Sequence, residues 1–192
     1  TFTVGGATTI GTGNTLTAPS SGALNLKGDY TNNGTFTHSS GTVTFNGTGT
    51  QTLSGTLNGS SSFNAVAVSG TGTVTNSTAM QADGAYSIAN GATFQQGANV
   101  NVVLTGATVS IASGGTFTKA SGSGVFILDG TTMTYTDSNA TKQNLGTLQI
   151  GQSPSTVTLS SDTSVENLNI HTTDTLNTKG YDVTVTHHVD CQ

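Results

Sequence analysis

The sequence predicts an all-β protein whose chain winds into a parallel β-helix (a β-solenoid) of roughly nine to ten coils, with no substantial helix. Two observations predict this fold. Short runs in which apolar residues alternate with hydroxyl residues recur along all 192 residues, and small turn residues separate the runs. The runs are shorter and more closely spaced than the strands of a β-sandwich. They therefore suit a chain that turns every few residues and stacks on itself.

The clearest copy of this pattern is residues 28–55, GDYTNNGTFTHSSGTVTFNGTGTQTLSG. It contains the runs TFT at 35–37, TVTF at 42–45 and TQTL at 50–53, separated by the turn sequences NNG, SSG and NG. Each run has one apolar face and one face of hydroxyls. This period of two indicates strands with one buried and one solvated face.

The rest of the chain repeats the pattern loosely. Gly or Asn interrupts every window in which a helical period could develop, which argues against helices. The strongest runs lie roughly 20 residues apart, a repeat length typical of solenoid coils. At ~4.8 Å per coil the rod would be on the order of 45 Å long. Further strands are expected at residues 2–4, 8–10, 15–17, 23–26, 63–68, 72–75, 85–88, 92–94, 100–104, 108–111, 115–118, 125–128, 132–136, 147–150, 156–159, 165–170, 175–176 and 181–186.

Stacking explains why such a chain folds. A single coil cannot bury its apolar side chains alone, so its stability comes from the coils above and below. The run VFIL at 125–128 is continuous rather than alternating, which predicts burial on both faces or a bend. Inside the stack we expect ladders of Asn, Ser or Thr, because buried polar groups require hydrogen-bond partners.

Composition narrows the functional classes. Charged residues make up 7% of the chain and the net charge is −5, with four lysines and no arginine. Such a chain cannot neutralise a run of phosphates, so nucleic acid is not an expected partner. The apolar runs are too short to span a membrane. We expect one domain, residues 1–192, and a leader removed before residue 1 would explain the strand-like start TFTV.

Two segments resemble repeats of large bacterial secreted and surface β-helix proteins of the filamentous-haemagglutinin and autotransporter-passenger type. The first is residues 27–55, which is Lys27 followed by the segment quoted above, and the other is VENLNIHTTDTLNTKGYDVTVT at residues 165–186. Residues 165–186 are similar to their unit of strand, turn, asparagine-glycine and strand, with Lys179-Gly180 in place of the asparagine-glycine pair. The resemblance implies an extracellular right-handed β-helix with a role in adhesion, display or matrix, and it carries over no catalytic site.

The distribution of carboxylates along the sequence argues against a catalytic site. β-Helix enzymes that act on polysaccharides need clustered carboxylates, whereas the nine acidic residues here are spread singly, often beside turn residues. Asp162 with Asp182, or Asp174 with Asp190, could align if each pair lies one coil apart. Solvated turn capping is the favoured interpretation. The sequence therefore predicts a protein that is not an enzyme and has no cofactor.

The C-terminal segment contains weak candidate metal ligands, His187, His188 and Asp190, followed by Cys191. Their spacing matches no zinc pattern, and adjacent histidines of a strand point to opposite faces. A structural terminal strand is the favoured interpretation, and a metal site between subunits is the alternative. Cys191 is the one cysteine, so it is incidental or forms an intermolecular disulfide.

Two further patterns have ordinary explanations. T-x-T triplets could form an ice-binding face, but they recur without a constant interval, which favours plain β-propensity. Five N-x-S/T sequons could accept glycans, although asparagine-glycine is itself a turn signal. The sequons begin at Asn33, Asn46, Asn58, Asn76 and Asn139.

Strand-like sequence lies close to both ends of the chain, without an obvious polar capping repeat. Exposed strand edges invite pairing with another copy, and a head-to-tail contact that does not close a ring makes a fibre. The sequence thus predicts an extracellular or cell-surface structural protein that assembles end to end into a filament or sheath. The alternative is an adhesin segment of a longer β-helix that binds surface glycans, and a polysaccharide-acting enzyme or an ice-binding protein ranks lower. The expected assembly edges are Thr1, Phe2, Thr3 and Val4 at one end and Val183, Thr184, Val185 and Thr186 at the other.

Overall fold

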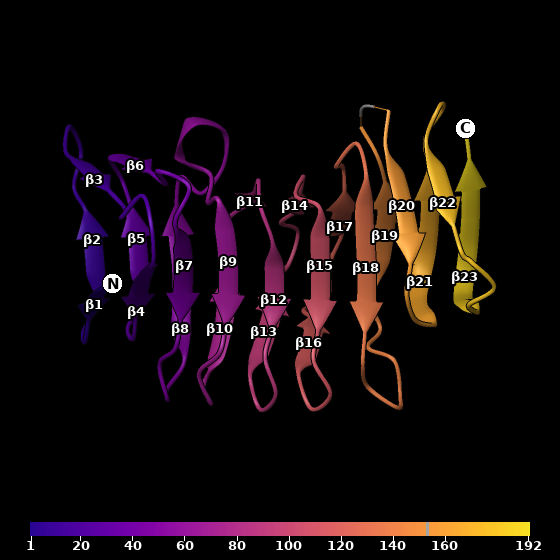
Figure 1. Cartoon of the computed structure of the whole chain (residues 1–192), viewed down its shortest axis with the longest axis horizontal. Coiled ribbons are helices and arrows are strands. Elements are labelled where there is room, and N and C mark those ends of the chain that lie inside the picture. Colours follow the sequence, from indigo (N-terminus) through magenta and orange to yellow (C-terminus); the bar gives the residue numbers. More distant parts are fainter. Residues whose placement is uncertain (153) are drawn as a thin grey trace.

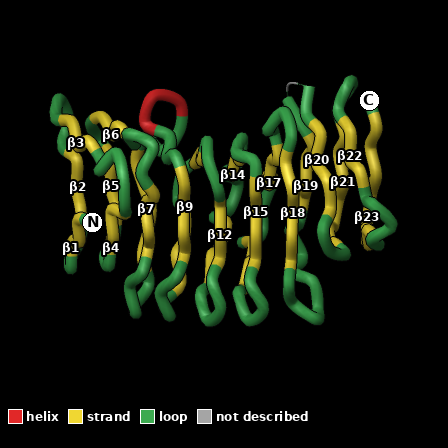
Figure 2. The backbone as a smooth tube through the Cα atoms, viewed as in Figure 1, coloured by secondary structure: helices red, strands yellow, loops and turns green. Residues whose placement is uncertain are grey.

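The protein is a β-solenoid of about nine stacked parallel coils, as the sequence predicts. The structure is a computed structural model that describes residues 1–152 and 154–192. Figure 1 shows a rod whose N-terminal and C-terminal coils lie at opposite ends. Strands and turns build nearly all of the described chain, and its one helical element is the 3-10 turn η1 (Gly59–Ser61), drawn red in Figure 2.

The strands form four parallel sheets that run along the rod. Sheet A consists of β1 (Phe2–Val4), β4 (Ala23–Leu26), β7 (Thr42–Phe45), β9 (Ala65–Val68), β12 (Tyr86–Ile88), β15 (Thr108–Ile111), β18 (Met133–Asp137), β20 (Thr156–Leu159) and β22 (Thr175–Asn177). Sheet B consists of β2 (Thr8–Ile10), β5 (Tyr30–Asn32), β8 (Gln51–Gly55), β10 (Thr73–Asn76), β13 (Thr93–Gln96) and β16 (Thr116–Lys119). Sheet C pairs β3 (Thr15–Thr17) with β6 (Thr35–Thr37). Sheet D consists of β11 (Met80–Ala82), β14 (Val102–Leu104), β17 (Val125–Leu128), β19 (Thr147–Ile150), β21 (Thr163–Ile170) and β23 (Val183–Cys191).

Each coil adds one strand to sheet A, and sheet A is therefore the sheet that extends from the first coil to the last. A middle coil such as β12, β13 and β14 adds a strand to each of sheets A, B and D. The last two coils differ from the middle coils. Their sheet D strands, β21 and β23, are long, and the register in which these two strands pair shifts between Val165 and Asn167.

In-register stacking builds the core. Side chains along a strand alternate between the interior and the outer surface, as the burial of β7 illustrates, with Val43 and Phe45 buried and Thr42 and Thr44 partly exposed. Loops of unequal length absorb the irregular sequence spacing, so inward residues still line up from coil to coil. One such column in sheet A is Phe2, Leu24, Val43, Val66, Tyr86, Val109, Tyr135 and Leu159.

Three tyrosines lie inside the stack. Burial raises the pKa of the Tyr30, Tyr86 and Tyr135 hydroxyls well above the ordinary value. For Tyr135 the neighbouring Asp137 carboxylate raises the pKa further. These side chains therefore contribute to the core as large neutral groups.

The buried amides do not form the expected ladders. Instead, Asn32, Gln51, Asn76 and Gln96 donate to backbone carbonyls. The Gln51 Nε2, for example, donates to two carbonyl oxygens of the preceding coil, at 3.0 and 2.8 Å. The inward amides therefore add hydrogen bonds to backbone carbonyls at the corners; the Leu26 carbonyl, for example, also accepts the Asn46 N–H of the next coil at 3.0 Å.

Several strand boundaries differ from the prediction. Strands β5 and β11 lie outside the predicted runs, because β5 turns the polar Asn32 inward and β11 contains no β-branched or aromatic residue. The expected strand 63–68 is split. Phe63 forms an isolated bridge with Ala82, and β9 begins only at Ala65. The prediction for residues 125–128 is confirmed, since Ile127 is 2% exposed although it points away from the main core.

The tight approach of neighbouring coils predicts that alanine changes the stability of the protein differently at two glycines. A Cβ on Gly72 would lie 1.9 Å from the Gly49 carbonyl oxygen, whereas a Cβ on Gly49 would meet nothing within 4 Å. Gly72→Ala should therefore destabilise the protein by about 1–3 kcal/mol, the usual cost of forcing atoms into a packed site. Gly49→Ala, the matched control in the adjacent coil, should change the stability by less than about 1 kcal/mol. Urea unfolding followed by circular dichroism checks both, and equal midpoints would contradict the expectation.

Candidate functional site: the two end coils

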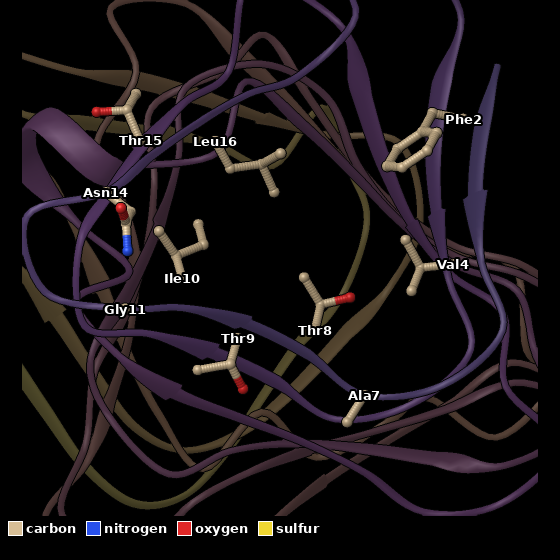
Figure 3. A pocket seen from close by; sticks show the side chains of 10 residues that line it. All are labelled: Phe2, Val4, Ala7, Thr8, Thr9, Ile10, Gly11, Asn14, Thr15 and Leu16. Carbon is tan, nitrogen blue, oxygen red and sulfur yellow. The ribbon is translucent and has the colours of Figure 1, made fainter.

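The first coil leaves the interior of the solenoid open. Figure 3 shows Phe2, Val4, Ile10 and Leu16 turned toward a hollow at this end of the rod. The hollow has a volume of about 430 Å³ and is lined by residues of β1, β2 and β3 and of the turns between them. Phe2 is 52% exposed, the highest value among the large apolar side chains of the described chain. These residues stack on the second coil through Leu24, Leu26, Asn32 and Phe36, and their opposite sides face the hollow.

The backbone of the first coil is also available. β1, β2 and β3 are each the terminal strand of their sheet, so each pairs on one side only. A terminal parallel strand presents unpaired N–H and C=O groups along its free edge. The first coil thus combines an apolar hollow with a rim of backbone hydrogen-bonding groups.

The last coil also carries unpaired strand edges. β22 and β23 are the terminal strands of sheets A and D. Leu176, Val183 and Val185 pack against the core from one side and remain partly exposed. Val189 and Tyr181 are 51% and 42% exposed.

The expected assembly edges lie on these two coils. Thr1, Phe2, Thr3 and Val4 lie on or beside β1, and Val183, Thr184, Val185 and Thr186 lie in β23. Within each strand only alternate residues turn inward. Sequence reasoning missed Ile10, Leu16 and Leu176, which face the interior of the same end coils. Their apolar character was visible, but only the winding of the chain brings them beside the edge strands.

The weak metal candidates do not come together. His187 and His188 are exposed neighbours on β23, and Asp190 accepts a hydrogen bond from Gln192 Nε2 at 2.9 Å. Cys191 is exposed and stacks in register with Ile170. Among residues 1–152 and 154–192, no three His, Cys, Asp or Glu side chains are grouped closely enough to hold a metal ion.

The carboxylates mainly hold turns and corners. Asp162 and Asp182 do lie on adjacent coils, but Asp162 accepts the backbone N–H of Asp182 at 3.0 Å. Asp174 likewise accepts the backbone N–H of Ser155 at 2.7 Å. Burial alone would raise the pKa of Asp83, yet hydrogen bonds from Ser62, Gln81 and Thr105, with the charge of His38, lower it. These contacts match turn capping rather than a paired acid and base.

The T-x-T triplets are distributed over several faces. Those that begin at Thr42, Thr132 and Thr156 point outward from sheet A, and Thr73 and Thr116 lie in register on sheet B with Thr93 between them. The irregular intervals reflect loops of different length rather than a lack of alignment. Within one face the hydroxyls are therefore ordered, although the triplets do not gather on a single face.

The five sequons differ in accessibility. Asn33 and Asn58 are exposed, and Asn46 is partly exposed. Asn76 is 0% exposed, and its side chain donates to the Thr78 carbonyl, so the folded chain offers no access to this amide. Asn139 is engaged with Gly115 and Asp137. Glycosylation of the folded protein therefore stays a prediction for Asn33, Asn46 and Asn58 only.

A comparison with protein-family models, with curated proteins and with solved structures found no match. The described part of the chain contains no helix of the length and hydrophobicity that crossing a bilayer requires. The architecture therefore defines the class of protein, a β-solenoid. Its function has to be inferred from the two end coils and the outer faces of the sheets.

Proposed function

We propose that the protein is a structural β-solenoid subunit that assembles end to end into a filament or sheath, outside the cell or at its surface. The observation that carries the proposal is the first coil, in which an apolar hollow of about 430 Å³ lies beside unpaired strand edges. The extracellular location rests on the resemblance of residues 27–55 and 165–186 to secreted β-helix repeats.

The partner of the first coil is the last coil of a second copy. Both coils present parallel strands, and sheet A ends in β1 at one end and in β22 at the other, so a second copy would continue the same sheet. The contact would cover Phe2, Val4 and Leu16, which are still exposed or partly exposed, with side chains such as Leu176 and Val183. Fully burying one large apolar side chain is worth about 1.5–3 kcal/mol, so several together can offset the cost of association.

Such a contact joins two different surfaces of each copy. Heterologous contacts of this kind produce open fibres when the rotation between copies does not close a ring. Sheet A would continue across the contact, because both end coils carry a strand of that sheet. A long filament with sheet A running through its subunit boundaries is the expected product.

The test compares elongation of the wild-type chain with that of two lysine variants of one strand. Phe2→Lys places a charge in the hollow and should abolish filaments in negative-stain micrographs and in high-speed pellets, because burying an unpaired charge is costly. Thr3→Lys, the matched control, changes the adjacent outward residue, whose register partner is Asn25, and should leave filaments intact.

Wild-type protein that stays as monodisperse short rods at every concentration would overturn the proposal. That result would favour the alternative in which further coils of a longer adhesin chain cover the open end. Equal loss of filaments in both variants would also count against the proposal, since the effect would not depend on the hollow.

A further inference from the structure

The outward surface of sheet A, which we call the A face, is the longest continuous surface of the rod. Figure 1 shows β7, β9, β12, β15 and β18 side by side along it. Its outward strand positions carry only small or neutral polar side chains. One column, stacked in register over seven coils, is Thr3, Asn25, Thr44, Ala67, Ser87, Ser110 and Thr136. A second column contains Thr108, Thr134, Thr158 and Asn177.

The strands of the A face present no charge to the outside, although the chain carries a net charge of −5. The one acidic residue in these strands, Asp137, points inward and is 0% exposed. Charged groups lie instead at corners and on other faces. Asp190 and Glu166, for example, belong to strands of sheet D, and Asp29 lies beside sheet B, where it accepts the backbone N–H of Thr52.

This distribution decides which surfaces of two copies can approach each other. Faces that carry carboxylates repel the same faces of another copy, and like charges placed opposite each other are destabilising. The A face has hydroxyls that both donate and accept hydrogen bonds, together with methyl groups, so it is complementary to itself. The aromatic side chains of its middle strands, Phe45, Tyr86 and Tyr135, are buried on the inner side and leave the outer surface without large protrusions.

The area of the A face determines whether two single copies could pair stably through it. Nine strands at ~4.8 Å spacing, each three to five residues long, give an area of about 500 Å² per copy. A stable pair of proteins usually buries about 800 Å² on each partner. A single copy is therefore too short to pair stably, whereas successive copies in a filament would add their A faces into one long surface.

We propose that the A face is a lateral interface between copies of this chain, through which filaments associate side by side into bundles or sheets. This inference rests on the proposed end-to-end assembly, because the area becomes sufficient only in a filament. The occupant of the A face is the A face of a second copy, packed sheet on sheet as in other face-to-face β assemblies.

The test places lysines on two faces of the same two coils. Ala67→Lys with Ser110→Lys charges the A face, and Thr73→Lys with Thr116→Lys charges sheet B in the same coils as a matched control. Bundles sediment at low speed, whereas single filaments sediment only at high speed. The A-face variant should lose the low-speed pellet and keep the high-speed pellet, and the control should keep both.

Ionic strength provides an independent readout. Raising the salt concentration screens exposed charges, so it should restore low-speed pelleting of the A-face variant if repulsion is the cause. Thermal melts of both variants show whether the fold is intact. An A-face variant that melts like wild type and still bundles would overturn the inference, as would solitary wild-type filaments at all salt concentrations. Absence of any filament from wild-type protein would instead refute the end-to-end assembly, so the two failures are distinguishable.

Discussion

Replacing Phe63 by alanine should destabilise the protein by about 3–5 kcal/mol, the range for large-to-small changes of a buried aromatic residue. Phe63 is 0% exposed and lies at the centre of a group of rings. Its ring centroid is 5.8 Å from that of Tyr30, 5.6 Å from that of Phe36 and 5.9 Å from that of Phe45. Because these rings come from the second and third coils, the cavity would weaken the stacking between them.

Urea unfolding followed by circular dichroism measures this loss. Phe2→Ala is the matched control, since it removes the same ring from a position that is 52% exposed. Its expected effect on the stability of the single rod is within about 0.5 kcal/mol, as for most surface substitutions. A solenoid can unfold coil by coil, so proteolysis of the N-terminal coils should accelerate in the Phe63 variant. Similar unfolding midpoints for the two variants would show that the ring cluster contributes little to the stability of the fold.

Replacing Asp137 by alanine is the second substitution with a large expected effect, a loss of about 3 kcal/mol, because a hydrogen bond to a charged group contributes about 1.5–3 kcal/mol. The Asp137 carboxylate is 0% exposed. It accepts hydrogen bonds from the backbone N–H of Gln143 at 2.6 Å, and from the backbone N–H and Nδ2 of Asn139 at 3.0 and 2.8 Å. Alanine would leave these donors without their acceptor.

The same carboxylate holds the connection that leads from β18 to β19. Alanine at position 137 would release the segment 138–146, and we expect a new protease cleavage site there as well as a lower unfolding midpoint. Asp182→Ala is the control, because Asp182 is exposed and its backbone rather than its side chain bonds Asp162. An Asp137→Ala protein with the wild-type midpoint and cleavage pattern would refute the expectation.

Much of the fold was predictable because the period-two pattern is local. The runs at 35–37, 42–45 and 156–159 coincide with β6, β7 and β20, and their apolar residues are the buried ones. β5 escapes prediction because one of its two inward residues, Asn32, is polar, and β11 because its residues, Met80, Gln81 and Ala82, include no β-branched or aromatic side chain. Such strands form because neighbouring coils supply the hydrogen bonds, which is a tertiary rather than a local effect.

The candidate site was predictable only in part. The strand-like runs at both ends indicated edges at Phe2 and Val183, and both lie on terminal strands. Neither the hollow nor the contributions of Ile10 and Leu16 to it followed from the pattern. They depend on how the turns close the first coil, and turn geometry is not encoded by alternation.

Alternation along the chain is enough to specify short strands with one apolar and one hydroxyl face, and composition is enough to specify a protein with little charge. Which strands lie over one another follows only from the folded chain. Loops of unequal length compensate for the irregular intervals, and they bring Thr3 and Ser110 into one uncharged column and Asp137 into the core. The sequence specifies the strands but not their stacking because alternation sets only the direction of each side chain. The register between coils is set by inter-coil hydrogen bonds, which form between residues about 20 positions apart.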